Sequence, residues 1–431
     1  MNLGLIDYTF SYSTFIFLFL FTFGLFYLVA QKIENKFKQY FIYTFCLSFF
    51  VYSGLGTAIL DDNGRYLFYY LVYCLTLVLS IFLFRNKTIK FKMEDEIISS
   101  FIDRKANIFI VIYIFIAFIQ LLLPENKLHF LLSPPSIDIT GVMDIVTREE
   151  ANDMFTSIAM LVKNIIFPFF FLSLTKYAKQ PIKLLFLILM PLYIGFCKDG
   201  YIARSVFGLY FLFYMAILYY YNYEKRKIIL VSTISIVLLS ISFLATFTYM
   251  RVGEKVDLSL SESINSLFVV EGTFPLWFED IYNNSLSAES HIVEYVLWII
   301  TQPFPGFMKS WLVDLYLNIS IAQVLLGLDP DEIVSYVPLV GLVGESVFVF
   351  GSKLFFLHAI ILGYIINIFL NIIVSKNSFK IIAIYAIVFT ALGLGRAGTA
   401  SSDSYAYMIK TMVYLPVLLY IFNLKLKPDN Y

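Results

Sequence analysis

Arginines stand directly beside apolar runs at four points of this sequence: Arg65, Arg204, Arg251 and Arg396. The last three lie near glycine, in the stretches "CKDGYIARSVF", "TYMRVGEK" and "GLGRAGT". Glycine lets the backbone approach a ligand closely, and arginine binds phosphate oxygens in a bidentate manner with a permanent charge. These three residues therefore predict a site for an anionic ligand, with anchoring of helix ends at lipid headgroups as the alternative. For Arg65, which follows two aspartates, we expect anchoring.

Acidic and imidazole side chains are candidates for proton transfer and substrate binding. Glu345, in "PLVGLVGESVFVFG", is a lone charge in an apolar segment. A carboxylate there is costly to bury unless it is paired, so we expect it to meet an arginine or to act as a base. His291 could accept a proton near neutral pH, with a structural role as the alternative. Asp403 and Glu271 are candidates for contacts with the substrate, although both could be simply solvated.

Two lysines extend the set of candidate cations. Lys198 belongs to the same stretch as Arg204. Lys163 lies inside the apolar segment 154–175, where it is expected to pair with a carboxylate of the site or to reach the outer surface. His358 falls within another apolar run, and we expect it to pack there.

Several kinds of chemistry lack their sequence motifs. The chain contains no G-x-x-x-x-G-K-[ST] phosphate loop, no H-E-x-x-H and no G-x-S-x-G. The three cysteines, Cys46, Cys74 and Cys197, lie in or beside apolar runs without C-x-x-C spacing, which is typical of small side chains in the lipid phase. The sequence therefore predicts a site without metal or cofactor. A formal charge of zero gives no reason to expect nucleic acid as a partner.

The composition shows which kind of structure must position these residues. Hydrophobic residues make up 60% of the chain and charged residues 14%, against about 25% charged in soluble domains. We predict an all-α, polytopic integral membrane protein of about 11 transmembrane helices, forming a single membrane domain over residues 1–431. The predicted helices cover 8–31, 39–60, 66–84, 106–124, 154–175, 184–197, 205–223, 228–250, 354–375, 381–395 and 411–424.

Basic residues predict the orientation of the helices. Nineteen lysines and arginines fall in one alternating set of connections and nine in the other, although the second set contains far more residues. By the positive-inside rule the first set is cytoplasmic, so the N-terminus is outside and the C-terminus inside. Both long hydrophilic connections, 125–153 and the large loop 251–344, then lie on the outer face. Apolar stretches in the large loop predict helices that lie along the membrane surface or pack over the bundle.

This arrangement resembles the bacterial O-antigen or oligosaccharide repeat-unit polymerases of the Wzy class. The resemblance rests on the layout and on four stretches: "CKDGYIARSVF", "TYMRVGEK", "VGLVGESVFVFG" and "GRAGTASSDSYAYMIK". It implies a GT-C-type glycosyltransferase of the bacterial inner membrane, with its active site facing the periplasm. The substrates would be undecaprenyl-pyrophosphate-linked oligosaccharides, and a chain-length regulator and a flippase would be further partners. Essential arginines of the family match Arg204, Arg251 and Arg396 by position, although "IARS" departs from the fuller family pattern around Arg204.

The resemblance also implies a mechanism. The growing glycan leaves its pyrophosphate carrier and passes to a sugar hydroxyl of the incoming lipid-linked unit. Arginines would stabilise the departing pyrophosphate in place of a metal, and Glu345 or His291 would take the proton of the hydroxyl. In "GRAGT" the small residues would leave room for the pyrophosphate beside Arg396. The alternatives are an O-antigen ligase, which depends on a loop histidine, and a flippase or transporter of lipid-linked sugars.

Overall fold

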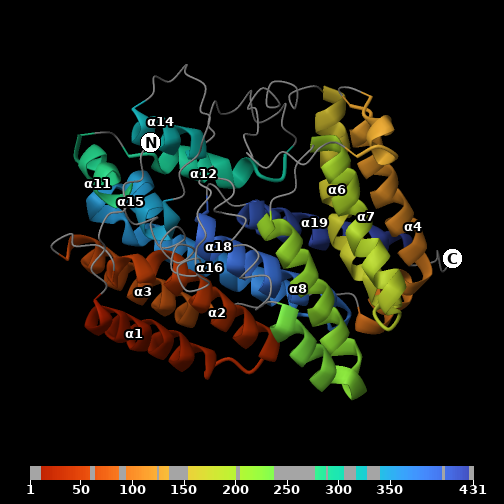
Figure 1. Ribbon diagram of the computed structural model, residues 1–431, viewed down its shortest axis with the longest axis horizontal. Coiled ribbons are helices and arrows are strands. Elements are labelled where there is room, and N and C mark those ends of the chain that lie inside the picture. The colour runs from red at the N-terminus through yellow and green to blue at the C-terminus, as the bar shows by residue number, and fades with distance from the viewer. Residues whose placement is uncertain are drawn as a thin grey trace, which may run out of the picture.

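The computed structural model of this protein is built from helices throughout the part that it describes (Figure 1). Described are residues 11–58, 64–86, 94–123, 126–134, 154–199, 204–236, 277–287, 290–304, 317–327, 340–399 and 403–426. The predicted all-α class is therefore confirmed for these residues. Of the first long connection, 125–153, the structure describes 126–134, and the rest lies outside the described residues.

The helices fall into the predicted bundle and the predicted large loop. Those of the bundle are α1 (Tyr12–Ala30), α2 (Lys36–Phe49), α3 (Arg65–Phe84), α4 (Asp95–Leu121), α6 (Met154–Ser173), α7 (Pro181–Asp199), α8 (Arg204–Tyr221), α16 (Phe356–Ile373), α17 (Lys380–Tyr385), α18 (Ala391–Ala397) and α19 (Asp403–Leu426). Two π-helical turns, η1 (Phe50–Gly54) and η8 (Ala386–Thr390), extend α2 and join α17 to α18. The predicted loop contains α11 (Phe278–Ser287), α12 (Ile292–Thr301), α14 (Leu317–Leu326) and the start of α15 (Gly341–Leu354).

Eight helical segments in the described chain are long and apolar enough to cross a membrane. They are Tyr12–Ala30, Lys36–Ala58, Arg65–Phe84, Met154–Tyr177, Pro181–Lys198, Phe356–Ile373, Asn377–Arg396 and Ser404–Ile421. This is the architecture of a multi-pass membrane protein. The predicted run 106–124 falls largely in α4, 205–223 falls largely in α8, and most of 228–250 lies outside the described residues. The count of eleven thus stays a prediction.

Contacts between helix ends agree with the orientation that the charge pattern predicts, because ends predicted to lie on the same side of the membrane contact each other. At the end predicted to be cytoplasmic, Lys38 of α2 donates to the side chain of Asn371 of α16. At the opposite end, the Ser11 amide before α1 donates to the Ala58 carbonyl at 2.9 Å. There Arg65, at the start of α3, pairs with Glu279 of α11 at 2.5 Å. Residues assigned to one side of the membrane by charge alone are therefore neighbours in space.

Asp95, the first residue of α4, forms hydrogen bonds with the connection between α16 and α17 at the predicted cytoplasmic end. Its carboxylate accepts from the amides of Asn377 and Ser378, both at 3.0 Å, and from the Ser378 hydroxyl at 2.6 Å. Partial burial raises the pKa of Asp95, but the hydrogen bonds from Ser378 and Asn377 and the nearby Lys376 outweigh it, so the pKa lies below its usual value.

The lowered pKa of Asp95 predicts an acid-labile contribution to stability. A carboxylate with a depressed pKa in the folded state stabilises it above the unfolded pKa of about 3.9, and this stabilisation is lost as pH falls through the folded value. We expect Asp95→Asn to lower the thermal unfolding temperature in detergent at pH 7, and the difference from wild type to shrink below about pH 4. Glu96→Gln, one residue along the same helix, is the matched control. An equal difference at pH 7 and pH 3.5 would contradict the assignment.

Close helix crossings in the bundle rely on glycine opposite serine. A Cβ atom on Gly363 of α16 would lie 2.5 Å from the Ser80 hydroxyl of α3, and one on Gly395 of α18 would lie 2.6 Å from the Phe49 amide nitrogen of α2. At both crossings the serine donates to the facing helix, from Ser80 to the Ile360 carbonyl at 2.9 Å and from Ser48 to the Leu392 carbonyl at 2.7 Å. Small residues and interhelical hydrogen bonds are the usual means of helix association in lipid.

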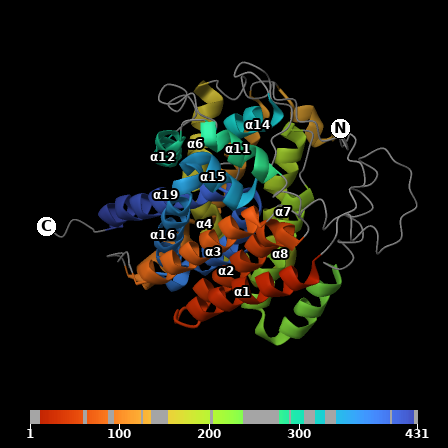
Figure 2. The ribbon, with the colours of Figure 1, turned by 90° about the vertical axis from the view of Figure 1, so that its left-hand side faces the viewer.

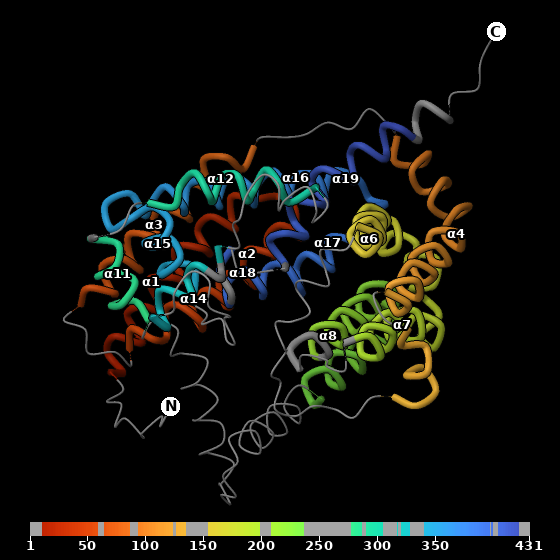
Figure 3. Tube along the Cα trace, turned by 90° about the horizontal axis from the view of Figure 1, so that it is seen from above, coloured from red at the N-terminus to blue at the C-terminus, as the bar shows by residue number. Residues whose placement is uncertain are grey.

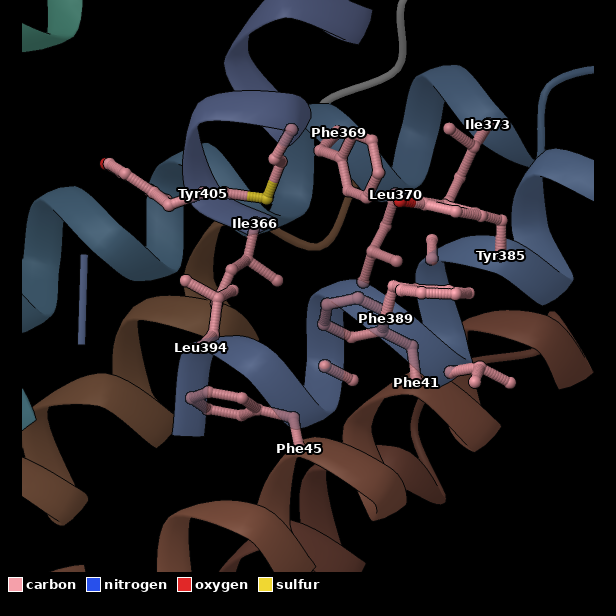
Figure 4. Packing of buried hydrophobic residues seen from close by; sticks show 14 of the residues in the cluster. Phe41, Phe45, Ile366, Phe369, Leu370, Ile373, Tyr385, Phe389, Leu394 and Tyr405 are labelled. Atoms are coloured by element: carbon pink, nitrogen blue, oxygen red, sulfur yellow. The ribbon is translucent and has the colours of Figure 1, made fainter. Parts of the chain in front are cut away.

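Aromatic and aliphatic side chains fill the space between α2, α16 and the segment from α17 to α19 (Figure 4). The Phe41 ring of α2 meets the Phe369 ring of α16 edge to face at 6.4 Å, and Tyr385 stacks on Phe389 at 4.3 Å. Viewed from above, α4, α6, α7 and α8 form a second group beside this one (Figure 3). The two groups meet through aromatic contacts such as that of Phe167 of α6 with Tyr385, at 5.5 Å.

The loop helices α11, α12 and α14 lie beside α15 at one end of the bundle (Figure 2). They cover the end at which α3 begins and α18 ends, because Arg65 pairs with Glu279 of α11 and the Tyr295 hydroxyl of α12 lies 3.2 Å from that of Thr399. Phe278 of α11 meets Tyr66 of α3 at 5.0 Å, and the His291 amide before α12 donates to the Val349 carbonyl of α15 at 2.9 Å. Helices packed over the bundle were one of the two predicted arrangements, and the contacts of α11 and α12 agree with it, while the outer loop itself stays a prediction. Anchoring at lipid headgroups was expected for Arg65, but its guanidinium has partners within the protein, since it pairs with Glu279 and lies 4.6 Å from the Tyr282 ring.

Candidate functional site

Glu345 is completely buried and is the centre of a polar cluster formed by four helices and one turn. One carboxylate oxygen accepts from the Thr399 amide at 2.7 Å, and the other accepts from the Thr399 hydroxyl. The second oxygen also lies 3.3 Å from Nε2 of His358. A buried carboxylate is tolerated only when its oxygens have donors, and these contacts supply them.

A second layer of polar groups completes the cluster. The Tyr73 hydroxyl of α3 lies 2.7 Å from Nδ1 of His358, and the Tyr295 hydroxyl of α12 lies 3.2 Å from that of Thr399. His358 and Thr399 are themselves fully buried, with 3.2 Å between Nε2 and the hydroxyl oxygen. We call Glu345, His358, Thr399, Tyr73 and Tyr295 the buried polar cluster. It joins α3, α12, α15 and α16 to the turn that follows α18.

Glu345 reaches this position because the helix is interrupted at Gly351, inside α15. Gly351 has φ of 74°, which a side chain would make unfavourable, and α16 starts only at Phe356. All residues from Gly341 to Phe350 are buried, so this part of α15 is enclosed by protein and is not the outer end of the span 354–375. The break lets His358, thirteen residues after Glu345 in the sequence, lie beside it in space.

The turn after α18 is shaped to receive the carboxylate. Gly398 has φ of 78°, and a Cβ atom there would collide with the Oε2 atom of Glu345. The space beside Gly395 is likewise taken by Ser48 and the backbone of α2. The expectation that small residues in "GRAGT" leave room for a ligand is therefore wrong for these two glycines. They allow close approach of protein groups instead.

Arg396 lies in the last turn of α18, three residues before Thr399. It is partly buried, and its guanidinium carbon lies 5.8 Å from the centre of the Tyr52 ring in η1. Arg396 and Glu345, two predicted site residues 51 positions apart, thus belong to one region of the fold. Glu345 forms hydrogen bonds with the turn after α18, and Arg396 lies in the helix just before that turn.

The helix α8 runs antiparallel to the segment from α17 to α18. The Tyr210 ring lies 4.7 Å from the Phe389 ring, and the ammonium group of Lys380 lies 5.7 Å from the Tyr220 ring. From the first contact to the second, residue numbers rise in α8 and fall in the segment from α17 to α18. The start of α8 and the end of α18 therefore lie at the same end of the bundle.

This packing sets the depth of Arg204 relative to Arg396. Arg204 precedes Tyr210 by six residues and Arg396 follows Phe389 by seven, so at 1.5 Å per residue each Cα lies about 10 Å beyond the contact between the two rings. The backbone thus places these two predicted arginines at similar depth on neighbouring helices.

The remaining predicted residues are placed as follows. Lys163 of α6 donates to the Gln120 side chain of α4 at 2.9 Å, within the second helix group and not in the buried polar cluster. The His291 ring stacks on Phe348 at 4.6 Å, and its role as a base stays a prediction. The carbonyl of Lys198, near the end of α7, accepts from Lys127 at 3.3 Å.

Four predicted residues have side chains outside the described structure, among them Arg204, whose backbone alone is described. Arg251 and Glu271 lie entirely outside the described residues. Asp403 is described only as the first residue of α19. Nothing is added here to what the sequence predicts of their side chains.

Within the described residues no group of three or more histidine, cysteine, aspartate or glutamate side chains could hold a metal ion. The three cysteines are free and buried, as predicted. Comparison with protein-family models, curated proteins and solved structures finds no match to this chain. The case for a function depends on the site alone.

Sequence reasoning missed four members of the buried polar cluster. His358 was expected only to pack; it packs and also bonds the central carboxylate. Tyr73 and Tyr295 lie in apolar runs in which tyrosine is common, since the chain contains 32 of them. The one usable signal was Thr399, because a threonine directly after glycine at a helix end is suited to hydrogen bonding in a turn.

Proposed function

We propose that this chain is a membrane glycosyltransferase that polymerises undecaprenyl-pyrophosphate-linked oligosaccharides at the outer face of the bacterial inner membrane. The observation that carries the proposal is the position of Arg396. Its side chain is partly buried, with the guanidinium near Tyr52, three residues before Thr399 of the buried polar cluster and at the end of the bundle that the loop helices cover. A guanidinium binds phosphate oxygens in a bidentate manner with a permanent charge, and Arg204 begins its helix at similar depth.

The chemistry fits a departing pyrophosphate. In the proposed reaction a sugar hydroxyl of the incoming unit attacks the anomeric carbon of the growing glycan. A new glycosidic bond forms, the bond from that carbon to the pyrophosphate oxygen breaks, and its electron pair stays on the pyrophosphate. The hydroxyl proton passes to a base. Charge grows on the pyrophosphate in the transition state, and preorganised guanidinium groups in a partly dry site stabilise this charge.

Purified protein in liposomes tests the proposal directly. We expect a defined undecaprenyl-pyrophosphate-linked repeat unit to be converted into products of two or more units, with free undecaprenyl pyrophosphate released in equal amount to the bonds formed. Transfer only to an added lipid A core acceptor would identify a ligase instead. Movement of the lipid-linked sugar across the bilayer without bond formation would identify a flippase. Either result would overturn the proposal.

A further inference from the structure

Glu345 was a candidate base, but its surroundings suit a different task. A base must reach the acceptor hydroxyl, whereas Glu345 is completely buried and both of its oxygens have donors. One oxygen binds the Thr399 amide, and the other binds the Thr399 hydroxyl and faces His358. The carboxylate is therefore aimed at the turn that follows Arg396.

The turn depends on this carboxylate for its shape. The helix α18 has only seven residues, and the chain reverses directly after it at Gly398, where φ is 78°. The Gly398 amide closes the helix by donating to the Leu394 carbonyl at 3.3 Å. The next amide, that of Thr399, is buried and bonds the carboxylate. Without the carboxylate a buried N–H and a buried hydroxyl would lose their partner, and the turn would rearrange to find new ones.

His358, to which Tyr73 is bound, contacts the Glu345 carboxylate from the side of α3 and α16. Tyr73 binds Nδ1 of His358, which leaves Nε2 to face Glu345 and Thr399. Tyr295 comes from the loop helix α12, so the cluster also joins the loop to the turn. A chain of contacts thus runs from α3 through His358 and Glu345 to Thr399, three residues from Arg396.

We infer that Glu345 and Thr399 are positioning residues that fix the guanidinium of Arg396 for its pyrophosphate ligand. The inference rests on the proposed function, since it assigns the buried polar cluster a task in that same site. In this role Glu345 does not act as the base that takes the proton of the acceptor hydroxyl. A misplacement of about 1 Å at a binding group can lower a rate about 100-fold, so loss of the cluster has a measurable effect without any contact to the substrate.

The first readout is Arg396 itself and does not require catalysis. Phenylglyoxal modifies accessible arginines, and mass spectrometry of peptides gives the rate at each site. We expect Thr399→Val and Glu345→Ala to raise the modification rate at Arg396 several-fold, and Thr399→Ser, which keeps the hydroxyl, to leave it at the wild-type value. Arg104, exposed on α4, is the internal control and is expected to react equally in all variants. An unchanged rate at Arg396 in both disruptive variants, with wild-type unfolding temperature, would overturn the inference.

The second readout separates a positioning carboxylate from a base. Glu345→Gln keeps an acceptor for the Thr399 amide, so we expect it to retain far more polymerisation than Glu345→Ala. In Thr399→Val we expect KM for the lipid-linked donor to rise about 10-fold or more, with Thr399→Ser near wild type. Full loss of activity in Glu345→Gln with an unchanged phenylglyoxal rate would make Glu345 the base and overturn the inference. If wild type shows no polymerisation, the proposed function fails, while the modification rates still decide whether the cluster positions Arg396.

Discussion

Replacing Arg396 with lysine is expected to abolish long glycan chains, so that single repeat units accumulate on a gel of surface glycan. Lysine keeps the positive charge but offers a point charge in place of the planar, bidentate guanidinium, and its shorter reach would also alter the contact with Tyr52. Loss of one preorganised charge-stabilising group lowers a rate about 100-fold or more. In liposomes the rate of pyrophosphate release should fall by the same factor, with little change in protein level.

Arg65→Lys is the matched control for this substitution. Arg65 also lies at the predicted outer end of a bundle helix, but its guanidinium is exposed and paired with Glu279. Exposed ion pairs contribute about 0 to 1 kcal/mol, so we expect normal chain length from this variant. Arg251→Lys, in another of the predicted motifs, should behave as Arg396→Lys does. A normal ladder of long chains from Arg396→Lys would refute the role of this arginine.

Gly395→Val is expected to give the largest loss of stability. Its Cβ atom alone would lie 2.5 Å from the Cβ of Ser48 and 2.6 Å from the Phe49 amide nitrogen, so α2 and α18 would have to move apart. Overpacking of this kind costs about 3 kcal/mol, and the Ser48 bond to the Leu392 carbonyl would be lost with it. A lower thermal unfolding temperature in detergent, with less folded protein in the membrane fraction, is the measurement.

Gly24→Val provides the control, since a Cβ atom on this glycine of α1 would meet nothing within 4 Å. The same change of residue type then has no crossing to disrupt, and we expect wild-type stability. Equal destabilisation of both variants would show that the effect belongs to glycine in a membrane helix generally and not to the crossing of α2 with α18.

The sequence predicted the helical class and the grouping of the helix ends well, because both depend on local properties. The length of an apolar run predicts a membrane span, and the count of basic residues in the connections predicts on which side its ends lie. The contacts of Lys38 with Asn371 and of Arg65 with Glu279 agree with these predictions. The arginines at helix ends were found for the same reason. Arg396 could be selected without knowledge of the fold, because it directly follows an apolar run.

The buried polar cluster was not predictable in the same way. Its members come from α3, α12, α15, α16 and the turn after α18, and which of them meet depends on the break at Gly351. The glycines of "GRAGT" show the limit most clearly. Their small size signalled that something approaches closely, but whether a ligand or Glu345 fills the space depends on packing between distant segments.

The enclosure of α15 has a consequence for how this helix is held in the bilayer. Its ten residues before Gly351 rise about 15 Å, less than the hydrocarbon thickness of about 30 Å, so it cannot remain in lipid as an independent span. A stable place for it in the membrane therefore requires the helices that surround it, α11, α16 and α18, which come from segments both before and after it in the chain.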